Sequence, residues 1–322
     1  MKIGADALTR FERGAKKSSL AASVRPPTRA DARSASSLKD GLCSGILTHT
    51  AYGKSRVRLV QVLRRGDRHD LRDLAIAIRF EGDYDASFSA GDNRDVLPTD
   101  TMKNTVYGLA GQEPLREPEA FALRLAEHFL AHNAQLRRAT IDVVDYQWRR
   151  IGIGEREHGR AFMRRGPDTR VATVTADRQA VVVESGIDDL IVMKTAGSAF
   201  SNFKHDEFTT LRETRDRLLA TALTARWRYS EPDLPFGSTW RVVRDALLNA
   251  FAEHESESVQ HTLYAMAREV LDSVDVVASI TLVMPNRHHL PVDLTPFGLE
   301  NRNEIFVATE EPYGRIEATL SR

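Results

Sequence analysis

The stretch SRVRLVQVLRRGDRHDLRDLAIAIRFEGDY, Ser55–Tyr84, predicts a pair of antiparallel strands. In its first part, Ser55–Arg65, Val and Leu alternate with charged residues, and Leu71–Tyr84 is a second run of strand character. Such runs, bounded by turn residues, are typical of β-structure. Gly66 and Asp67 supply the turn between them. We therefore expect a β-hairpin at the start of the folded part of the chain.

Two helices are expected after this hairpin, because the apolar period lengthens from two residues to three or four. The second of them is expected to follow Pro118. The apolar positions are Met102, Val106 and Leu109 or Ala110 in the first helix, and Phe121, Leu125 and Phe129 in the second. Strands at Thr140–Ile151 and Thr169–Asp177 are expected to follow.

The same order of elements then returns in the second half of the chain. We expect a strand or hairpin at Ala180–Thr195 and a long strand at Arg217–Tyr229, although the latter also suits a helix. Two helices and two strands complete the half. The helices carry Val243, Leu247 and Phe251, then Leu263, Met266, Val270 and Val274, and the strands are Ala278–Asn286 and Asn303–Leu320.

Strand–strand–helix–helix–strand–strand, occurring twice, predicts an α+β fold with a duplicated unit. Hairpin connections imply antiparallel sheets, each with a helix pair on one face. We divide the chain into an extension at residues 1–45, a first unit at residues 46–179 and a second unit at residues 180–322. Four-stranded sheets have open edges that favour pairing with another copy of the chain, so we expect a closed oligomer.

Composition narrows the class of protein further. The 322 residues are 42% hydrophobic and 28% charged, as in an ordinary globular protein, and the formal net charge is zero. Residues 1–40 contain nine basic and four acidic residues, and with little apolar content the extension is expected to be disordered. A nucleic-acid partner would rest on this extension alone, so we expect none. No apolar run is long enough to span a membrane.

The single cysteine, Cys43, excludes an internal disulfide and any site that needs several cysteines. The chain has no apolar signal core near its start, and it ends Leu320-Ser321-Arg322 rather than in a peroxisomal Ser-Lys-Leu signal. These features lead us to expect a cytoplasmic protein.

Three polar clusters are candidates for a site, since no phosphate loop, dinucleotide motif or zinc helix motif is present. The first, residues 92–107, contains Thr99 and Asp100 where a helix N-cap is expected. The second is MPNRHHLPVDL, residues 284–294, and the third is PFGLENRNEIFVATEEPYG, residues 296–314. His288 and His289 would point to opposite faces of a strand, so we expect no metal site there. Alone, each cluster is explained equally well by capping or by a turn.

Together these motifs resemble the urate oxidase family, in the family's order and spacing over residues 52–319. The resemblance is carried by Tyr52–Lys54, VLPTDTMKNTVY at residues 96–107, FTTLRETRDRLLAT at 208–221, SVQHTLYAMA at 258–267, and MPNRHH with PFGLENRNE and EPYG. It implies the tunnelling fold, with two units per chain and sheets that close into barrels in a homotetramer. It also implies oxidation of urate by O₂ and water to 5-hydroxyisourate and hydrogen peroxide, in purine catabolism, without a cofactor.

The resemblance further implies a site shared between subunits. Phe200 would stack on the purine, Arg217 and Gln260 would bind one edge of the ring, and Val259 would donate its amide. Thr99 and Asp100 would reach the other edge from a neighbouring subunit. The implied catalytic group is Lys54, Thr99 and His288, which would relay a proton, while Asn286 would help to hold O₂ or water above the ring.

Three other functions are alternatives to this one. Pterin-making hydrolases share the tunnelling fold but need a metal-binding set of cysteine and histidine that Cys43 alone cannot provide. A non-catalytic purine-binding protein would keep Phe200, Arg217 and Gln260 but would not need Lys54 or His288. A nucleic-acid-binding module would show affinity that falls steeply with salt.

Overall fold

The structure, a computed structural model, describes residues 45–309 and 311–322, and His49–Arg322 form one compact unit. The expected disordered extension at residues 1–45 lies outside the described residues except for its last residue. Among the described residues, no helix is both long and apolar enough to cross a membrane.

The elements follow the predicted order in each half. The first half contains β1 (Tyr52–Arg65), β2 (Arg68–Gly82), α1 (Asp85–Ser89), α2 (Thr99–Gln112), α3 (Pro118–His132), β3 (Leu136–Asp145), β4 (Trp148–Ile153), β5 (Arg156–Arg164) and β6 (Thr169–Ala176). The second half contains β7 (Val181–Lys194), β8 (Leu219–Tyr229), α4 (Phe236–Glu253), α5 (Val259–Ser273), β9 (Val277–Arg287), β10 (His289–Pro291), a 3₁₀ turn (Thr295–Phe297), β11 (Phe306–Ala308) and β12 (Gly314–Ser321).

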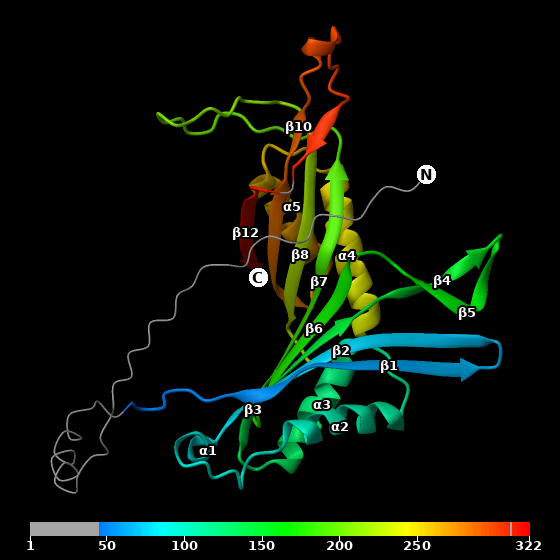
Figure 1. Cartoon of the computed structure of the whole chain (residues 1–322), viewed down its shortest axis with the longest axis vertical. Coiled ribbons are helices and arrows are strands. Elements are labelled where there is room, and N and C mark those ends of the chain that lie inside the picture. The colour runs from blue at the N-terminus through cyan, green and yellow to red at the C-terminus, as the bar shows by residue number, and fades with distance from the viewer. Residues whose placement is uncertain (1–44, 310) are drawn as a thin grey trace, which may run out of the picture. The chain divides into compact units, whose positions relative to one another are not determined.

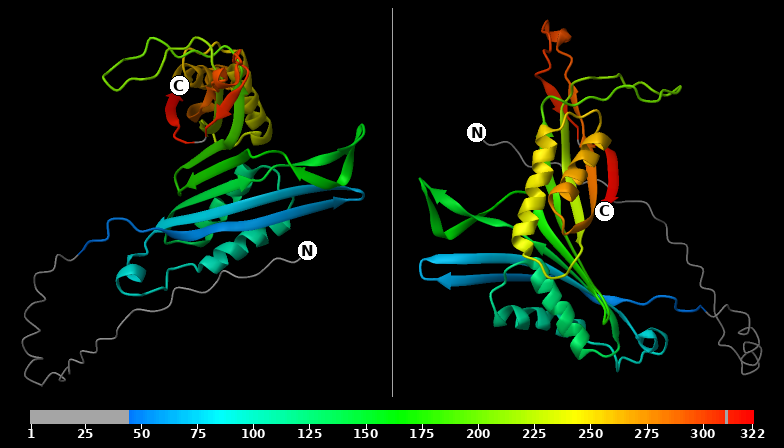
Figure 2. Two further views of the ribbon diagram at one scale, coloured as in Figure 1. Left: turned by 45° about the horizontal axis from the view of Figure 1, so that its top comes forward. Right: turned by 180° about the vertical axis from the view of Figure 1, so that it is seen from behind.

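One antiparallel sheet of eight strands runs through both halves, in the order β1-β2-β3-β6-β7-β8-β9-β12. Helices α2 and α3 pack on the first four strands, and α4 and α5 pack on the last four (Figures 1 and 2). The helix faces that the period predicts are buried against the sheet, for example Met102, Leu125, Leu247 and Met266. This is the α+β tunnelling fold expected from the sequence, with two tandem sheet-plus-helix-pair units.

The structure corrects several expected elements. The two four-stranded sheets are continuous, because β6 pairs with β7 across the junction of the halves. Thr140–Ile151 is not one strand: β3 ends at Asp145, and Trp148 begins a separate β4–β5 hairpin. This hairpin was missed because its side chains are mostly exposed and show no apolar face. Helix α1 was also missed, since five residues are too few to show a period.

Other ambiguous segments have a single outcome in the structure. Val181–Lys194 is one strand rather than a hairpin, and the segment that also suited a helix is strand β8. Its apolar residues are buried on both faces, which explains why the two-residue alternation is weak there. Asn303–Leu320 is divided into β11 and β12, which belong to different sheets.

The two halves repeat each other in detail as well as in order. A register shift interrupts β1 against β2 between Lys54 and Val57, and β7 against β8 between Ile187 and Leu190. Each bulge contains a non-glycine residue with a φ of 55°, Arg56 in β1 and Asp189 in β7. Bulges with positive φ cost free energy, so their recurrence at the matching step of both halves supports the internal duplication.

A glycine precedes each bulge by one step, and the backbone of the next strand occupies the space beside it. A Cβ built on Gly53 would lie 1.8 Å from the carbonyl oxygen of Ile78, and one built on Gly186 would lie 2.4 Å from that of Ala225. No side chain fits at these distances without displacing a strand. Glycine is therefore required at both positions to let the bulged strands approach their neighbours.

We predict that Gly53→Ala lowers the free energy of unfolding by about 1–3 kcal/mol, because the added methyl group must push β1 away from β2. Thermal and urea denaturation monitored by circular dichroism measure this. Gly108→Ala in α2 is the matched control, since nothing lies within 4 Å of its added Cβ, and alanine is the better helix former there. Equal stability of the two variants would contradict the steric argument.

Candidate active site

A pocket of about 620 Å³ opens at one end of the second half. Its volume falls within the range usual for small-molecule sites. Five segments line it: the loop between β7 and β8, the start of α5, the end of β9, the β10–β11 hairpin, and β12 through Ile316. Figure 1 shows this loop and this hairpin extending from the same end of the half. Six of the residues expected at the site line this pocket: Phe200, Arg217, Val259, Gln260, Asn286 and His288.

The long loop between β7 and β8 is closed at its base by backbone hydrogen bonds. Phe200 and Thr214 exchange two of them, at 2.7 and 2.9 Å, and the Arg217 N–H donates to the Ser198 carbonyl at 2.8 Å. A second bridge joins Ser198 to Ser256, just before α5. These bonds hold Phe200 and Arg217 near the start of α5 although the three positions are far apart in the sequence.

The guanidinium of Arg217 lies 5.1 Å from the centroid of the Phe200 ring. Its Nε is buried and has no hydrogen-bond partner among the described residues, and none of those residues forms an ion pair with it. Burial lowers the pKa of Arg217, but a guanidinium keeps its charge near neutral pH. A buried cationic donor without a partner is costly unless a ligand supplies an acceptor. The arrangement therefore suits a flat, anionic ligand that stacks on Phe200.

Backbone donors at the start of α5 face the same pocket. Ser258 caps the helix by accepting a hydrogen bond from the His261 N–H at 3.1 Å. Val259 and Gln260 are the first two helical residues, whose N–H groups have no partner within the helix. Such a helix start favours an acceptor or an anion. The Gln260 side chain adds a donor and an acceptor side by side.

Asn286 and His288 approach the pocket from the end of β9. The Asn286 Nδ2 lies 3.5 Å from the His288 Nδ1, and the Thr309 N–H donates to the His288 carbonyl at 2.9 Å. His288 lies between β9 and β10 rather than in a strand, so the expected alternation of His288 and His289 fails, and both residues line the pocket. Within residues 45–309 and 311–322, no group of three or more metal-ligating side chains is close enough to hold an ion.

Lys54, Thr99 and Asp100 lie elsewhere, in the first half of the chain. Lys54 immediately precedes the β1 bulge, and Thr99 and Asp100 begin α2. The expected capping role is wrong: Pro98 occupies the N-cap position, Thr99 is the first helical residue, and no side chain caps the helix. The Asp100 carboxylate instead accepts from Lys103 and, at 2.9 Å, from Asn104.

These three residues form a local cluster of their own. The hydrogen bond from Lys103 lowers the pKa of Asp100, and the charge of Lys54 adds a smaller effect in the same direction. The Thr99 and Asp100 amides, like those of α5, begin a helix and are available to an acceptor.

Tyr52 connects the two parts of this cluster, a role that the sequence did not suggest. Its hydroxyl oxygen accepts a hydrogen bond of 3.0 Å from the Leu97 N–H, two residues before Thr99. Its ring packs edge-on against Tyr84, at 4.8 Å between centroids. Tyr52 therefore ties the segment that carries Thr99 to the strand that carries Lys54. The only sequence signal for this role of Tyr52 is that it lies two residues before Lys54 and therefore on the same face of β1.

The sequence profile of the family described as Uricase matches residues 50–175 and 183–317. The chain belongs to the uricase family. Uricase from Arthrobacter globiformis is 40% identical over 277 residues, which are 86% of this chain and 90% of that protein. Uricase from Danio rerio is 34% identical over 279 residues, 85% of this chain and 94% of the relative. The family expectation is confirmed, and with it the expectation that the chain is an enzyme, an oxidoreductase of the uricase type.

Solved structures agree with the fold. The crystal structure of uricase from Arthrobacter globiformis matches with a TM-score of 0.84, covering 87% of this chain and 96% of that chain at 40% identity. A urate oxidase structure from Bacillus sp. TB-90 matches with a TM-score of 0.76 and covers 85% of this chain and 100% of that chain. At 21% identity, the second likeness concerns the fold alone.

We predict that Tyr52→Phe lowers the free energy of unfolding by about 1 kcal/mol and speeds hydrogen exchange at the Leu97 amide, because that N–H loses its acceptor. Denaturant unfolding and amide exchange measure the two effects. Tyr107→Phe is the matched control, since its exposed hydroxyl also bonds to backbone, at the Arg58 carbonyl. If the Leu97 amide exchanged equally fast in both variants, Tyr52 would not fix the start of α2.

Proposed function

We propose that the protein is a urate oxidase of purine catabolism, which converts urate, O₂ and water to 5-hydroxyisourate and hydrogen peroxide without a cofactor. Two electrons leave the purine and reduce O₂ to peroxide, while the oxygen atom of water becomes the new hydroxyl group. Family membership supports the choice of urate. The single observation that carries it is the half-buried Arg217 guanidinium beside the Phe200 ring, whose buried Nε has no hydrogen-bond partner among the described residues.

The second-half pocket supplies the groups that a urate anion requires. Phe200 offers an aromatic face for stacking, worth about 1 kcal/mol beyond area burial. The planar fork of Arg217 matches a carbonyl oxygen next to a ring nitrogen, and its charge favours the anion. Gln260 and the Val259 amide match the acceptors and donors along the same edge. Holding the ring in one plane sets the position at which O₂ must meet it.

We assign the opposite side of the site to a neighbouring subunit, which would contribute Lys54, Thr99 and Asp100. The sheet has two free edges among the described strands, β1 and β12, and an antiparallel pairing of these edges between copies would close a barrel. Such pairing would bring the bulge of β1 and the start of α2 to the pocket beside β9 and β12. We propose a homotetramer built in this way.

The junction inside each chain supports this assignment, because β6 and β7 there meet as β12 and β1 would between chains. Gly237, the second residue of α4, lies in one pocket with Asp145 and Arg170 of the first half. In the repeat, Gly237 corresponds to Asp100, since each is the second residue of the first long helix in its half. The start of that helix therefore faces the preceding half, as a shared site requires.

Lys54, Thr99 and His288 would carry the proton transfers. Deprotonation makes the purine electron-rich enough to reduce O₂, so positioning and proton removal take the place of a redox cofactor. The Thr99 hydroxyl can both accept and donate a proton, and it would connect Lys54 to the ligand. Asn286, 3.5 Å from the His288 ring, would hold O₂ or water above the purine.

We further propose that the two units divide at residues 46–179 and 180–322 and that the enzyme is cytoplasmic. The first point is supported by the recurrence of the bulges on either side of the junction. The second is supported by the single cysteine, which suits a reducing compartment.

We predict that the purified protein consumes urate with O₂ and releases peroxide at the same rate after dialysis against EDTA. The reason is that no proposed step uses a metal. Urate absorbance, an oxygen electrode and a peroxide assay measure the stoichiometry, which should be one to one to one. A loss of activity on chelation that added metal restores would exclude the cofactor-free reaction.

We predict that Lys54→Met lowers kcat far more than urate affinity, and that Arg217→Ala raises KM strongly, because one residue serves the chemistry and the other binds the ring. When the two variants are denatured and refolded together and assayed at a urate concentration too low for Arg217→Ala to turn over, activity should return to about a quarter of that of the wild type. This is the fraction of sites that draws both halves from intact copies.

A second mixture controls for nonspecific rescue. Lys54→Met mixed with Thr99→Ala should stay inactive, since both residues lie in the first half and every shared site would carry one of the two defects. Recovery in both mixtures, or in neither, would contradict a site composed of the first half of one chain and the second half of another.

A further inference from the structure

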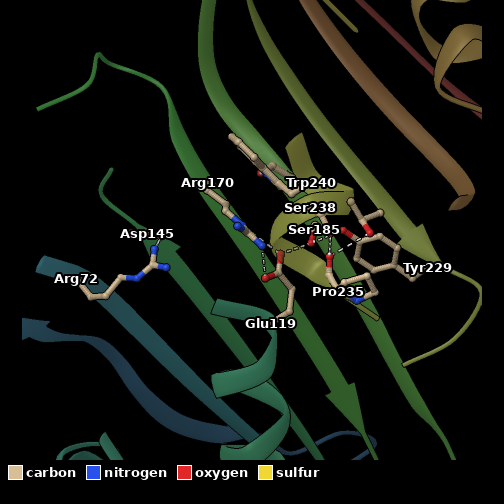
Figure 3. A network of polar contacts seen from close by, with 11 residues as sticks. Arg72, Glu119, Asp145, Arg170, Ser185, Tyr229, Pro235, Ser238 and Trp240 are labelled. Atoms are coloured by element: carbon tan, nitrogen blue, oxygen red, sulfur yellow. Dashed lines mark hydrogen bonds and ion pairs between the residues drawn. The ribbon is translucent and has the colours of Figure 1, made fainter. Parts of the chain in front are cut away.

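The junction between β6 and β7 contains a buried polar network that the proposed reaction does not use. Glu119 is completely buried, and its carboxylate accepts from the Arg170 Nη2 at 2.6 Å and from Nε at 3.3 Å. The Ser185 hydroxyl donates to the same carboxylate, and Tyr229 donates to Ser185 at 3.0 Å. Figure 3 shows these side chains converging. Burial, together with the nearby Glu119 charge, raises the pKa of Tyr229 to about 12.

The network crosses from one half of the chain to the other. Glu119 and Arg170 come from α3 and β6 of the first half, whereas Ser185 and Tyr229 come from β7 and β8 of the second. The Arg170 guanidinium also lies 5.2 Å from the ring centroid of Trp240 in α4, and Trp240 donates to the Gly186 carbonyl at 3.0 Å. The ion pair thus contacts two elements of the opposite half, β7 and α4, and it is connected to β8 through Ser185.

The members of this network occupy positions that correspond to the candidate active site. Glu119 is the second residue of α3, as Gln260 is the second residue of α5. Asp145 pairs with Arg170 at the same step of β3 and β6 at which Asn286 pairs with Gly314 in β9 and β12. Gln260 and Asn286, the two amides of the candidate site, therefore correspond to the carboxylates Glu119 and Asp145 at the junction. Gly314 corresponds to Arg170.

These differences between corresponding residues decide whether each pocket has room for a ligand. Gly314 has no side chain, whereas Arg170 extends one that meets Glu119. The junction pocket, about 360 Å³, is smaller than the candidate site, about 620 Å³. Lys54 corresponds to Ile187, because each immediately precedes the bulge of its strand. The junction therefore lacks the proposed base and contains its own cation and anion.

We propose that the β6–β7 junction is a second, closed copy of the purine site, in which the Glu119–Arg170 ion pair takes the place of a ligand. Glu119 and Arg170 then act as positioning residues, because their ion pair fixes the angle between the two halves of each chain. That angle sets how the Lys54 side of one subunit meets the Arg217 side of the next. This last step rests on the shared urate site proposed above.

The test replaces Glu119 by Gln, the residue at the corresponding position of the second half. The neutral amide leaves Arg170 a buried cation without its counter-ion, so the junction must relax. We expect kcat for urate to fall on the order of tenfold to a hundredfold, since small displacements of catalytic groups have effects of this size. Xanthine, a purine with the same six-membered ring, should bind with little change, because Phe200, Arg217 and Gln260 belong to one half.

Asp73→Asn is the matched control. Asp73 is also a buried carboxylate, paired with Arg58 and bonded to Trp148, but all of its partners lie in the first half. It should lower thermal stability without changing kcat at a temperature at which the protein is folded. If Glu119→Gln fails to fold, the double variant Glu119→Gln with Arg170→Met removes both charges, should fold, and should show the same loss of kcat.

A distance measurement separates this inference from the proposed function. Spin labels at the exposed positions Glu127 in α3 and Val242 in α4 report the angle between the halves, in a Cys43→Ser background. The distance distribution should broaden or shift in Glu119→Gln and stay unchanged in Asp73→Asn. An unchanged distribution in Glu119→Gln, or wild-type kcat in that variant, would overturn the positioning role.

Ligand stoichiometry tests the closure itself. Equilibrium dialysis with xanthine should give one bound purine per chain, and two per chain would overturn the closed copy. If the wild-type enzyme does not oxidise urate, the proposed function fails, whereas the distance distributions still decide whether Glu119 sets the angle between the halves.

Discussion

The pairing of β6 with β7 is the constraint on which the rest of the structure depends. Each half alone has an apolar sheet face covered by two helices, and either half could bury that face by itself. Because the two edge strands pair, the halves become one twisted sheet, and the angle between them is no longer free. This junction therefore sets the positions of the two halves relative to each other, and with them the two groups of proposed site residues.

The continuity of the sheet has a chemical consequence. It separates Lys54 and Thr99 on the first half from Arg217 and Gln260 on the second, and the pocket described contains only the latter pair. Among the described strands, β1 and β12 lie at the edges of the sheet, and the proposed pairing of these edges would bring the two groups together between copies. Unpaired sheet edges normally favour aggregation. In the proposed oligomer they would instead pair with each other and complete the active site.

The duplicated unit explains where non-glycine residues adopt a positive φ, which such residues rarely do. Non-glycine residues with positive φ recur in the same bulge of each half, and a glycine accepts a close backbone approach just before each. In the first half the bulge follows Lys54, whereas in the second it follows the buried Ile187. The same strained backbone thus supports the charged Lys54, a proposed site residue, in one half and the packing of Ile187 in the other, since a bulge redirects the side chains beside it.

The fold class, the family and most of the helices and strands follow from the amino-acid sequence, but α1 and the β4–β5 hairpin do not. The spacing of apolar residues predicts the helices that bury Met102 and Leu125. Five motifs in the family's order indicate the family, which the family profile confirms. These signals are local, so they survive without knowledge of the fold. Only the tertiary structure decided that the two sheets are one, that Tyr52 holds the start of α2, and that Glu119 bonds across the junction. The Tyr52 and Glu119 contacts join residues 45 and 66 positions apart, and no local pattern records which distant group a polar side chain will meet. Strands β6 and β7 are neighbours in the sequence, but a strand pattern alone does not say which strand is its partner.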